Sequence, residues 1–487
     1  MSNCVLAIDV GTSSARVIGY DVSGRSIPGL RAQTHYSVIA DPSGKAEIGP
    51  EQLLQCVSQC VDQSLEVVRL RKLTVAAVGA CTFWHSMVGV DVEGQAVTPI
   101  YTWADMRSAE TAENLSASLD ATAVHSRTGC SIHPSYWPAK LAWLSRQEKQ
   151  LARRVDRWMS PGEYLYSRWI GDAECSISMA SGTGLLDQNA CDWDDEMLTA
   201  AGIDRNLLLP LAADGHNASG LRHNWKRRWP ELAKIPWVPA VGDGAASNLG
   251  SGCANDTRVA INLGTSGAIR VLWRAERAEI PEELWCYRLD RQRFVMGAAF
   301  SDGGDDFVWA MKTIAAPGRE VVEAEVGKRA PDCHGLTFLP FLAGERSMAW
   351  RPNARATLHG LSVTSTPTDI IQAIMEGVAL RFALAADILQ RQFPDAREVM
   401  ASGGAIANSP AWARIIADAI GKPVTLSNEP EASSRGAALL ALKAAGLIED
   451  ETDVPTPLGD RIEPDPTRHE LLMSALQRQQ DLYRRLV

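Results

Sequence analysis

The sequence has no excess of basic residues and no long apolar segment. It holds 48 lysines and arginines against 58 aspartates and glutamates, a formal net charge of -10. Binding to nucleic acid without sequence preference needs a basic surface, so we expect no nucleic-acid partner. No apolar run approaches the roughly 20 residues that span a bilayer. The first residues also lack the basic segment of a signal peptide. We therefore expect no membrane association and a cytoplasmic location.

Paired cysteines and several common site motifs are also missing. The ten cysteines form no C-x-x-C pair, which argues against a zinc ribbon or a thioredoxin site. The Gly-Lys pairs at Gly44, Gly327 and Gly421 are never followed by Ser or Thr, so none is a Walker loop. Neither G-x-G-x-x-G after the first strand nor a G-x-S-x-G elbow occurs. The length of 487 residues and the 46% hydrophobic content predict a globular protein of two or three domains.

An internal repeat is the most informative feature that is present. Residues 7–17 read AIDVGTSSARV, and residues 260–271 read AINLGTSGAIRV. In each segment an apolar run meets Gly-Thr-Ser and a second apolar run follows, which predicts a β-hairpin. Chance similarity of two hairpins is the alternative. Because the copies lie about half a chain apart, we expect two domains of related design, residues 1–252 and 253–487.

The rest of the pattern mixes helices with strands and predicts an α/β fold. Helical spacing covers residues 53–68, 369–393 and 410–420, and apolar strands cover residues 75–80, 88–92, 237–241 and 398–401. We expect Thr368 to cap the second of these helices and Ser409 the third. Residues 301–306, SDGGDD, lack the alternating ligands of a calcium loop, so we expect a strand-to-helix turn there.

The two hairpin turns predict a site for phosphate groups. The first turn consists of Gly11, Thr12, Ser13 and Ser14, and the second of Gly264, Thr265 and Ser266. Small residues in a turn leave backbone N–H groups open to an oxyanion, and Asp9 could hold a hydrated Mg²⁺ beside the first turn. In the second copy Asn262 replaces Asp9. Each turn alone could be a plain hairpin, but the matched pair predicts two cradles around one polyphosphate.

Asp243 is the candidate general base. It stands between two glycines, directly after an apolar run and near the boundary of the two halves. An isolated Gly-Asp-Gly is often only a turn. Its place between two predicted phosphate turns instead favours a carboxylate that accepts the proton of an acceptor hydroxyl. We also consider Asp243 a metal ligand together with Asp9.

From Leu6 to about Gly446 the chain resembles the FGGY family of carbohydrate kinases. The C-terminal signature of the family is matched by residues 356–361, ATLHGL, and 369–376, DIIQAIME. The N-terminal signature fits less well, because Trp137 stands where the family usually has Pro, Ser or Thr. The resemblance implies the duplicated actin-like (sugar kinase, Hsp70 and actin) ATPase fold, with two domains around a nucleotide cleft. It also implies ATP and Mg²⁺ as cofactors and a small sugar or sugar acid as substrate.

The same resemblance implies further site residues. Those expected at the adenosine are Gly403, Gly404, Ala405 and Asn408, and those expected at the acceptor are His85, Trp103, Asp105, Arg107 and Asp243. A structural role for His85, and mutual pairing of Asp105 with Arg107, are the alternatives. The loop 344–347, Gly-Glu-Arg-Ser, resembles one of gluconate and pentulose kinases, and we expect it to be mainly structural.

Taken together, these motifs look most like those of gluconate kinases. The resemblance then implies phosphorylation of a hydroxyl of a sugar acid by ATP, with Asp243 as the base. A xylulose or ribulose kinase is one alternative. An actin-like or Hsp70-like ATPase without a small acceptor is another. We include a homodimer among the expected assemblies.

Overall fold

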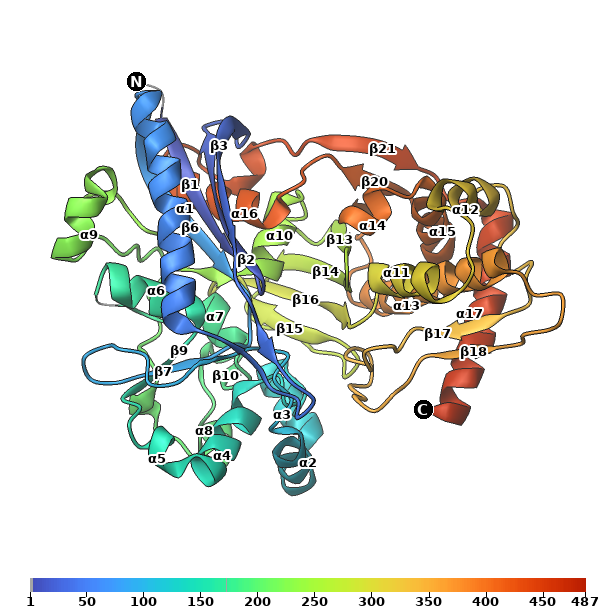
Figure 1. Cartoon of the computed structure of the whole chain (residues 1–487), viewed down its shortest axis with the longest axis horizontal. Helices are drawn as coiled ribbons and strands as arrows, with labels where there is room; N and C mark the ends of the chain where they lie inside the picture. Colours follow the sequence, from blue (N-terminus) through green and yellow to red (C-terminus); the bar gives the residue numbers. More distant parts are fainter. Residues whose placement is uncertain (1–2, 172) are drawn as a thin grey trace.

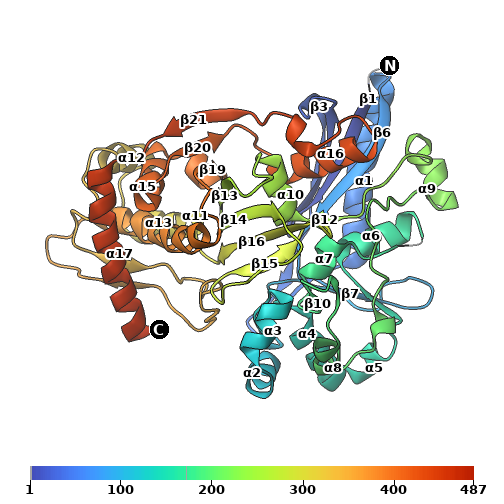
Figure 2. The ribbon, with the colours of Figure 1, turned by 180° about the vertical axis from the view of Figure 1, so that it is seen from behind.

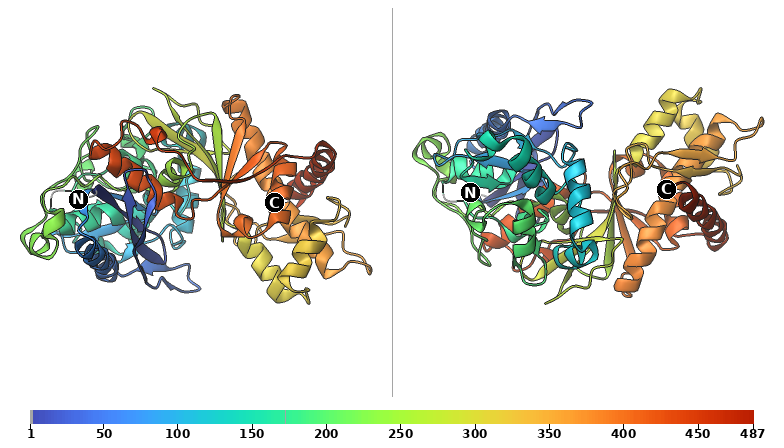
Figure 3. Two further views of the ribbon diagram at one scale, coloured as in Figure 1. Left: turned by 90° about the horizontal axis from the view of Figure 1, so that it is seen from above. Right: turned by 90° about the horizontal axis from the view of Figure 1, so that it is seen from below.

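The structure of the protein, a computed structural model, describes residues 3–171 and 173–487. They form two lobes, one coloured mainly blue to green and the other mainly yellow to red (Figure 1). The view from behind shows a β-sheet in each lobe with helices against it (Figure 2). From above and below, the lobes meet across a narrower middle (Figure 3).

The N-terminal lobe is built on a five-stranded sheet with the order β12-β6-β1-β2-β3. Its strands are β1 (Asn3–Val10), β2 (Ser14–Asp21), β3 (Ser26–His35), β6 (Thr74–Thr82) and β12 (Val241–Gly242). Strand β2 runs antiparallel to both β1 and β3, while β6 and β12 extend the sheet in parallel beside β1. The apolar run 237–241 therefore adds only its last residue to a strand, and Trp237 forms isolated bridges.

The sheet of the C-terminal lobe has the order β15-β16-β14-β13-β19-β20-β21. Its strands are β13 (Arg258–Leu263), β14 (Gly267–Arg274), β15 (Trp285–Arg288), β16 (Arg293–Phe300), β19 (Glu398–Ser402), β20 (Val424–Ser427) and β21 (Leu458–Ile462). The middle five repeat the first sheet: an antiparallel hairpin β13–β14, then β16 on one side, and β19 and β20 in parallel on the other. The predicted duplicated α/β fold is confirmed.

Two helices of small residues cross where the lobes meet. They are α10 (Asp243–Gly250), directly after β12, and α16 (Ala432–Ala444), which follows β20 and packs on β1 and β6. A Cβ at Gly250 would lie 1.8 Å from the Ala432 carbonyl oxygen, and one at Gly436 would lie 1.8 Å from that of Ala246. Only glycine permits this approach. The division of the chain at residue 252 stays a prediction.

All three predicted helices are confirmed, with one change of cap. They are α1 (Pro50–Leu70), α13 (Pro367–Gln392) and α15 (Pro410–Ile420), the last capped by Ser409. Helix α13 begins after Thr366 rather than Thr368. Thr366 and Asp369 form a reciprocal capping box around Pro367, which outcompetes the later threonine. Residues 301–303 join β16 to α11 (Gly304–Thr313) as the expected strand-to-helix turn.

The remaining elements surround the two sheets. In the N-terminal lobe the helices are α2 (Ala109–Ser118), α3 (Ala121–Thr128), α4 (Trp137–Gln147), α5 (Lys149–Ala152), α6 (Pro161–Trp169), α7 (Ile177–Ser181), α8 (Asp195–Ala201) and α9 (His223–Arg228). Its short strands are β4 (Ile39–Ala40), β5 (Ala46–Ile48), β7 (Val88–Val90), β8 (Ile100–Tyr101), β9 (Arg157–Met159), β10 (Leu186–Asp187) and β11 (Asp192–Trp193). The C-terminal lobe adds α12 (Arg319–Val326), α14 (Gly404–Ala407), α17 (Pro466–Leu486), β17 (Thr337–Leu339) and β18 (Thr357–His359).

The buried apolar residues form two large, separate clusters. One belongs mainly to the N-terminal lobe but includes Leu272, Trp285, Tyr287 and Val295 of the C-terminal sheet, and the other lies in the C-terminal lobe. All ten cysteines are free thiols. Among the described residues, no helix combines the length and the apolar character that a bilayer crossing requires.

Candidate active site

The first turn, residues 11–14, is closed on itself and held by two aromatic residues. The Gly11 N–H donates to the Ser14 carbonyl at 2.9 Å, and Tyr36 Oη donates to the Gly11 carbonyl. Trp103 Nε1 donates to Thr12 Oγ1 at 3.1 Å. The N–H groups of Thr12 and Ser13 make no hydrogen bond with any described residue. The turn is thus rigid and keeps backbone donors for a ligand.

Asp9 lies at the end of β1, beside this turn, and is 7% exposed. Its Oδ2 accepts a hydrogen bond from Ser434 Oγ of α16 at 3.0 Å, and the nearest cation, Arg16 Nη1, is 3.8 Å away. Arg16 binds Glu431 more closely, at 2.6 Å. Burial raises the pKa of Asp9, while Arg16 and Ser434 oppose that shift. A metal ion at this carboxylate would favour its ionised form, so the residues present fit a hydrated Mg²⁺.

The second turn, residues 264–266, is held by glycines of two neighbouring segments. A Cβ at Gly304 would lie 2.4 Å from the Gly264 carbonyl oxygen. At Gly403, which has φ +103°, it would lie 2.4 Å from the Leu263 carbonyl oxygen. Asn408 Nδ2 donates to the Gly404 carbonyl at 2.7 Å across α14, the helix that contains Ala405. The structure therefore brings the second turn and the predicted adenosine residues together.

Asp243 is the first residue of α10, and the glycines on either side of it are required by close packing of a tryptophan. The indole of Trp84 packs against both, since a Cβ would come within 1.8 Å of it at Gly242 and 2.7 Å at Gly244. The Asp243 carboxylate accepts a hydrogen bond from the Gly244 N–H at 2.8 Å. Burial raises the pKa of Asp243 to about 6, Arg270 opposes this shift and Asp9 adds to it. Charged groups of both lobes therefore act on the pKa of this carboxylate.

His85 is packed among aromatic rings as a neutral side chain. Its Nδ1 donates to the Gly182 carbonyl at 2.5 Å, and its ring packs edge-on against Tyr136 and Tyr287. Burial lowers the pKa of His85 to about 3, the Gly182 carbonyl opposes the shift and Arg346 adds to it. The hydrogen bond of Nδ1 to Gly182 fits the structural alternative for His85. Contact of His85 with an acceptor stays a prediction.

Asp105 and Arg107 pair with each other. Arg107 Nη2 lies 2.6 Å from Asp105 Oδ2 and 2.6 Å from Glu47 Oε1. The Asp105 carboxylate also accepts the Ala46 N–H at 3.0 Å. Among the described residues neither side chain bonds to Asp243 or to the turns, so the structure does not bring them together with the base. Trp103, in the same loop, does reach the first turn.

Four residues near Asp9 and Asp243 were not among the predicted site residues. Ser433 Oγ donates to the Asp243 carbonyl at 3.3 Å, and Ser434 binds Asp9. The positive charges of Arg270, on β14, and Arg346 both lower the pKa of Asp243. A signal for the serines existed in the sequence, because Gly-Ala-Ala occurs at 244–246 in α10 and again at 436–438 in α16.

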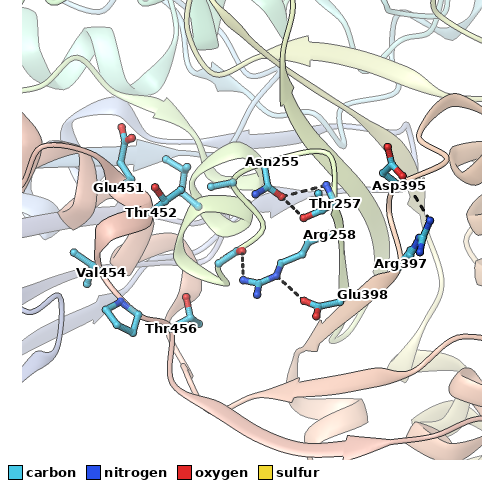
Figure 4. Close-up of a pocket in the computed structure, with 14 residues that line it drawn as sticks. Asn255, Thr257, Arg258, Asp395, Arg397, Glu398, Glu451, Thr452, Val454 and Thr456 are labelled. Atoms are coloured by element: carbon cyan, nitrogen blue, oxygen red, sulfur yellow. Dashed lines mark hydrogen bonds and ion pairs between the residues drawn. The ribbon is translucent and has the colours of Figure 1, made fainter.

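A separate hollow lies beside the end of α10 (Figure 4). Its lining includes Arg258, which binds Glu398 at 2.8 Å and the Gly252 carbonyl at 3.1 Å. Asn255 accepts hydrogen bonds from Thr257 in the same wall. None of the predicted site residues lines this hollow, and the groups drawn there are largely bonded to one another.

The chain matches the model of the FGGY family of carbohydrate kinases, N-terminal domain, over residues 4–250. It matches the C-terminal domain of the same family over residues 259–445. The chain belongs to the FGGY family of carbohydrate kinases. It is therefore an ATP-dependent carbohydrate kinase, and the ATPase alternative without a small acceptor does not apply.

Known FGGY kinases resemble the chain over nearly its whole length. The gluconokinase of Bacillus subtilis is 27% identical over 92% of this chain and 89% of its own. The xylulose kinase of Escherichia coli is also 27% identical, over 99% of this chain and 98% of its own. The crystal structure of gluconate kinase from Lactobacillus acidophilus superposes with a TM-score of 0.93 at 23% identity, covering 100% of this chain and 98% of that one. This likeness confirms the fold.

Proposed function

We propose that this FGGY kinase transfers the γ-phosphoryl group of ATP to a hydroxyl of a sugar acid, and that gluconate is its acceptor. The observation that carries the proposal is the placement of Asp243. It is a half-buried carboxylate at the start of α10, within range of Asp9 in one lobe and Arg270 in the other. The motif pattern and the gluconokinase relative support gluconate among the acceptors of the family.

ATP would lie between the lobes as the phosphoryl donor. Open N–H groups of residues 12–13 and of residues 265–266 would bind its phosphates from two sides. Gly403, Gly404, Ala405 and Asn408 would lie against the adenosine. Gly404 is the open position among them, since a Cβ there would meet nothing closer than Asn408 Nδ2 at 3.9 Å. Asp9, and Asp243 as a second candidate, would hold Mg²⁺. When bound, this ion would neutralise part of the phosphate charge.

Asp243 would accept the proton of the acceptor hydroxyl as its oxygen attacks the γ-phosphorus. A pKa of about 6 makes this carboxylate a stronger base than an ordinary aspartate, while it stays largely ionised near neutral pH. Its place at the N-terminus of a helix favours the ionised form. The remaining contribution of the protein is alignment of the two substrates.

The test is ATP turnover with and without gluconate, xylulose, ribulose and glycerol, each over a range of concentrations. We expect gluconate to give the highest kcat/KM. A higher value for xylulose or ribulose would replace the sugar acid with a pentulose. A homodimer and a cytoplasmic location remain predictions, and mass measurement in solution tests the first.

A further inference from the structure

Two arginines at the candidate active site have no anionic partner. They are Arg270 on β14 and Arg346 in the loop between β17 and β18. The Nε atom of each is buried without a hydrogen-bond partner. In the described part of the chain neither guanidinium forms an ion pair or a hydrogen bond. Arg16 and Arg381 also have a buried unpaired Nε, but each reaches a glutamate through another nitrogen. A desolvated guanidinium without a counter-charge is costly.

Both arginines lie around Asp243. The Arg270 Nε is 3.2 Å from the position that a Cβ on Gly244 would take, next to that carboxylate. The Arg346 guanidinium lies over the ring of Trp103 at 5.0 Å and near that of Trp350 at 6.0 Å. Trp103 is in turn bonded to the first turn. Arg346 thus lies against the loop that contains Trp103, and Arg270 lies beside the predicted base.

The surrounding groups do not supply the missing negative charge. Burial lowers the pKa values of His85 and His133 to about 3, so both rings are neutral. Glu345, next to Arg346, is bound by Arg381 and by Tyr483. Among the described residues, Asp243 is the carboxylate whose charge acts on Arg270, and one carboxylate leaves one positive charge of the pair without compensation.

We propose that Arg346 and Arg270 bind the carboxylate of the acceptor, while one of its hydroxyls faces Asp243. The inference rests on the proposed function and names the groups that recognise the acid. A guanidinium offers a planar pair of N–H donors that matches a carboxylate. The indoles of Trp103 and Trp350 would then lie against the C–H groups of the acceptor. The transferring phosphoryl group is the other anion that the pair could bind.

The experiment compares wild type, Arg346→Gln and Arg270→Gln with two acceptors of the same carbon skeleton. These are gluconate and glucitol, which lacks the carboxylate. We expect each substitution to raise the KM for gluconate roughly 30-fold or more, the range for bonds to charged groups. The affinity for glucitol, measured as a KM or as an inhibition constant, should change less than about threefold. The KM for ATP should also change less than about threefold. Calorimetric titration of gluconate without ATP gives a readout that does not depend on turnover.

Matched variants separate recognition from damage to the fold. Arg351→Gln makes the same change five residues away, where an exposed guanidinium lies 5.8 Å from the ring of Tyr483, and should leave gluconate affinity unchanged. Arg346→Lys, which keeps the charge but loses the planar donors, should lie between wild type and Arg346→Gln. Melting temperatures show whether each variant is folded.

Two results overturn the inference alone. One is an increase in the KM for ATP without one for gluconate, which assigns the arginines to the phosphoryl group. The other is an equal loss of affinity for gluconate and for glucitol in both variants. If wild type itself prefers xylulose to gluconate, the proposed acceptor is wrong, and this is visible before any variant is made.

Discussion

The two turns occupy equivalent places in the two sheets but differ in what surrounds them. Four residues separate the last paired positions of β1 and β2, Val10 and Ala15, whereas three separate Leu263 and Gly267. The buried carboxylate of Asp9, on β1, comes just before the first turn. At the matching place in β13, the Asn262 amide donates to Ser402 Oγ at 3.2 Å. Duplication preserved the cradle and left an acid at this place in only one copy.

The difference extends to the helices behind the turns. Both crossing helices, α10 and α16, begin beside the N-terminal turn, where Ser433 and Ser434 meet Asp243 and Asp9. The second turn meets instead the start of α11, where the Gly304 N–H donates to Gly264 and the Asp305 N–H to Thr265. We infer that the first lobe supplies metal binding and proton acceptance, and that the second mainly binds nucleotide.

The largest expected effect comes from removing the base. Asp243→Asn should lower kcat roughly 10²-fold or more, which is the range for loss of a general base, while ATP still binds. The measurement is steady-state turnover with gluconate, together with ATP titration by calorimetry. Asn262→Asp, which places an acid in the second copy, should not restore turnover in this variant. Normal turnover of Asp243→Asn would remove the base from its assigned role.

Helices α10 and α16 share the run Gly-Ala-Ala and approach each other through matched glycines, so we expect matched changes there to have matched effects. A methyl group at Gly250 or at Gly436 would each meet a backbone oxygen at 1.8 Å. Gly250→Ala and Gly436→Ala should each lower the free energy of unfolding by about 1–3 kcal/mol, the cost of overpacking. Thermal and urea unfolding measure this loss.

Gly318→Ala is the control for these two variants, since no heavy atom lies within 4 Å of the added methyl. It should leave stability within about 0.5 kcal/mol of wild type, as for an ordinary surface change. If Gly250→Ala and Gly436→Ala behave like this control, the crossing does not require glycine.

Much of this arrangement could be predicted from the sequence, because it depends on local signals. The repeated Gly-Thr-Ser hairpins, and Ser409 before Pro410, are read from neighbouring residues. The contact of Ser434 with Asp9 joins residues 425 positions apart, and no local rule places them together. Whether an arginine has a partner, as for Arg107, or lacks one, as for Arg346, depends equally on distant segments. For the cap of α13, the spacing of Thr366 and Asp369 was the better signal.

A change at Asp9 tests the assignment of the metal to the first lobe. Asp9→Asn should lower turnover about tenfold at limiting Mg²⁺, and it should raise the Mg²⁺ concentration that gives half-maximal rate, because a neutral amide is a weaker ligand for this ion. Turnover measured against Mg²⁺ concentration checks both effects. Asn262→Ala is the matched change in the second lobe and should leave the Mg²⁺ dependence as in wild type. An unaltered Mg²⁺ dependence of Asp9→Asn would contradict the metal assignment.

The smallest expected effect concerns the acids at the start of α11, beside the second turn. Asp306 is 0% exposed, and neither of its carboxyl oxygens has a partner. Burial raises the pKa of Asp306 to about 8, and Asp302 and Asp305 add to the shift. The unfolded chain has an ordinary pKa near 3.9. Between about pH 4 and pH 8 the folded protein keeps a proton that the unfolded chain loses, so this group lowers stability as the pH rises.

Asp306→Asn replaces the carboxyl with an amide that does not titrate in this pH range, so the variant lacks this pH-dependent loss of stability. Relative to wild type it should therefore gain stability as the pH rises from 5 to 8, by about 1 kcal/mol or more at pH 8. The measurement is the difference in unfolding free energy between variant and wild type at each pH. Asp305→Asn, at the exposed neighbour, removes only one of the charges that add to this shift, so its pH-dependent gain should be smaller than that of Asp306→Asn. A gain for Asp306→Asn that is constant, or larger at acidic pH, would show that this buried acid is ionised in the folded protein and that the second turn, like the first, has a charged carboxylate beside it.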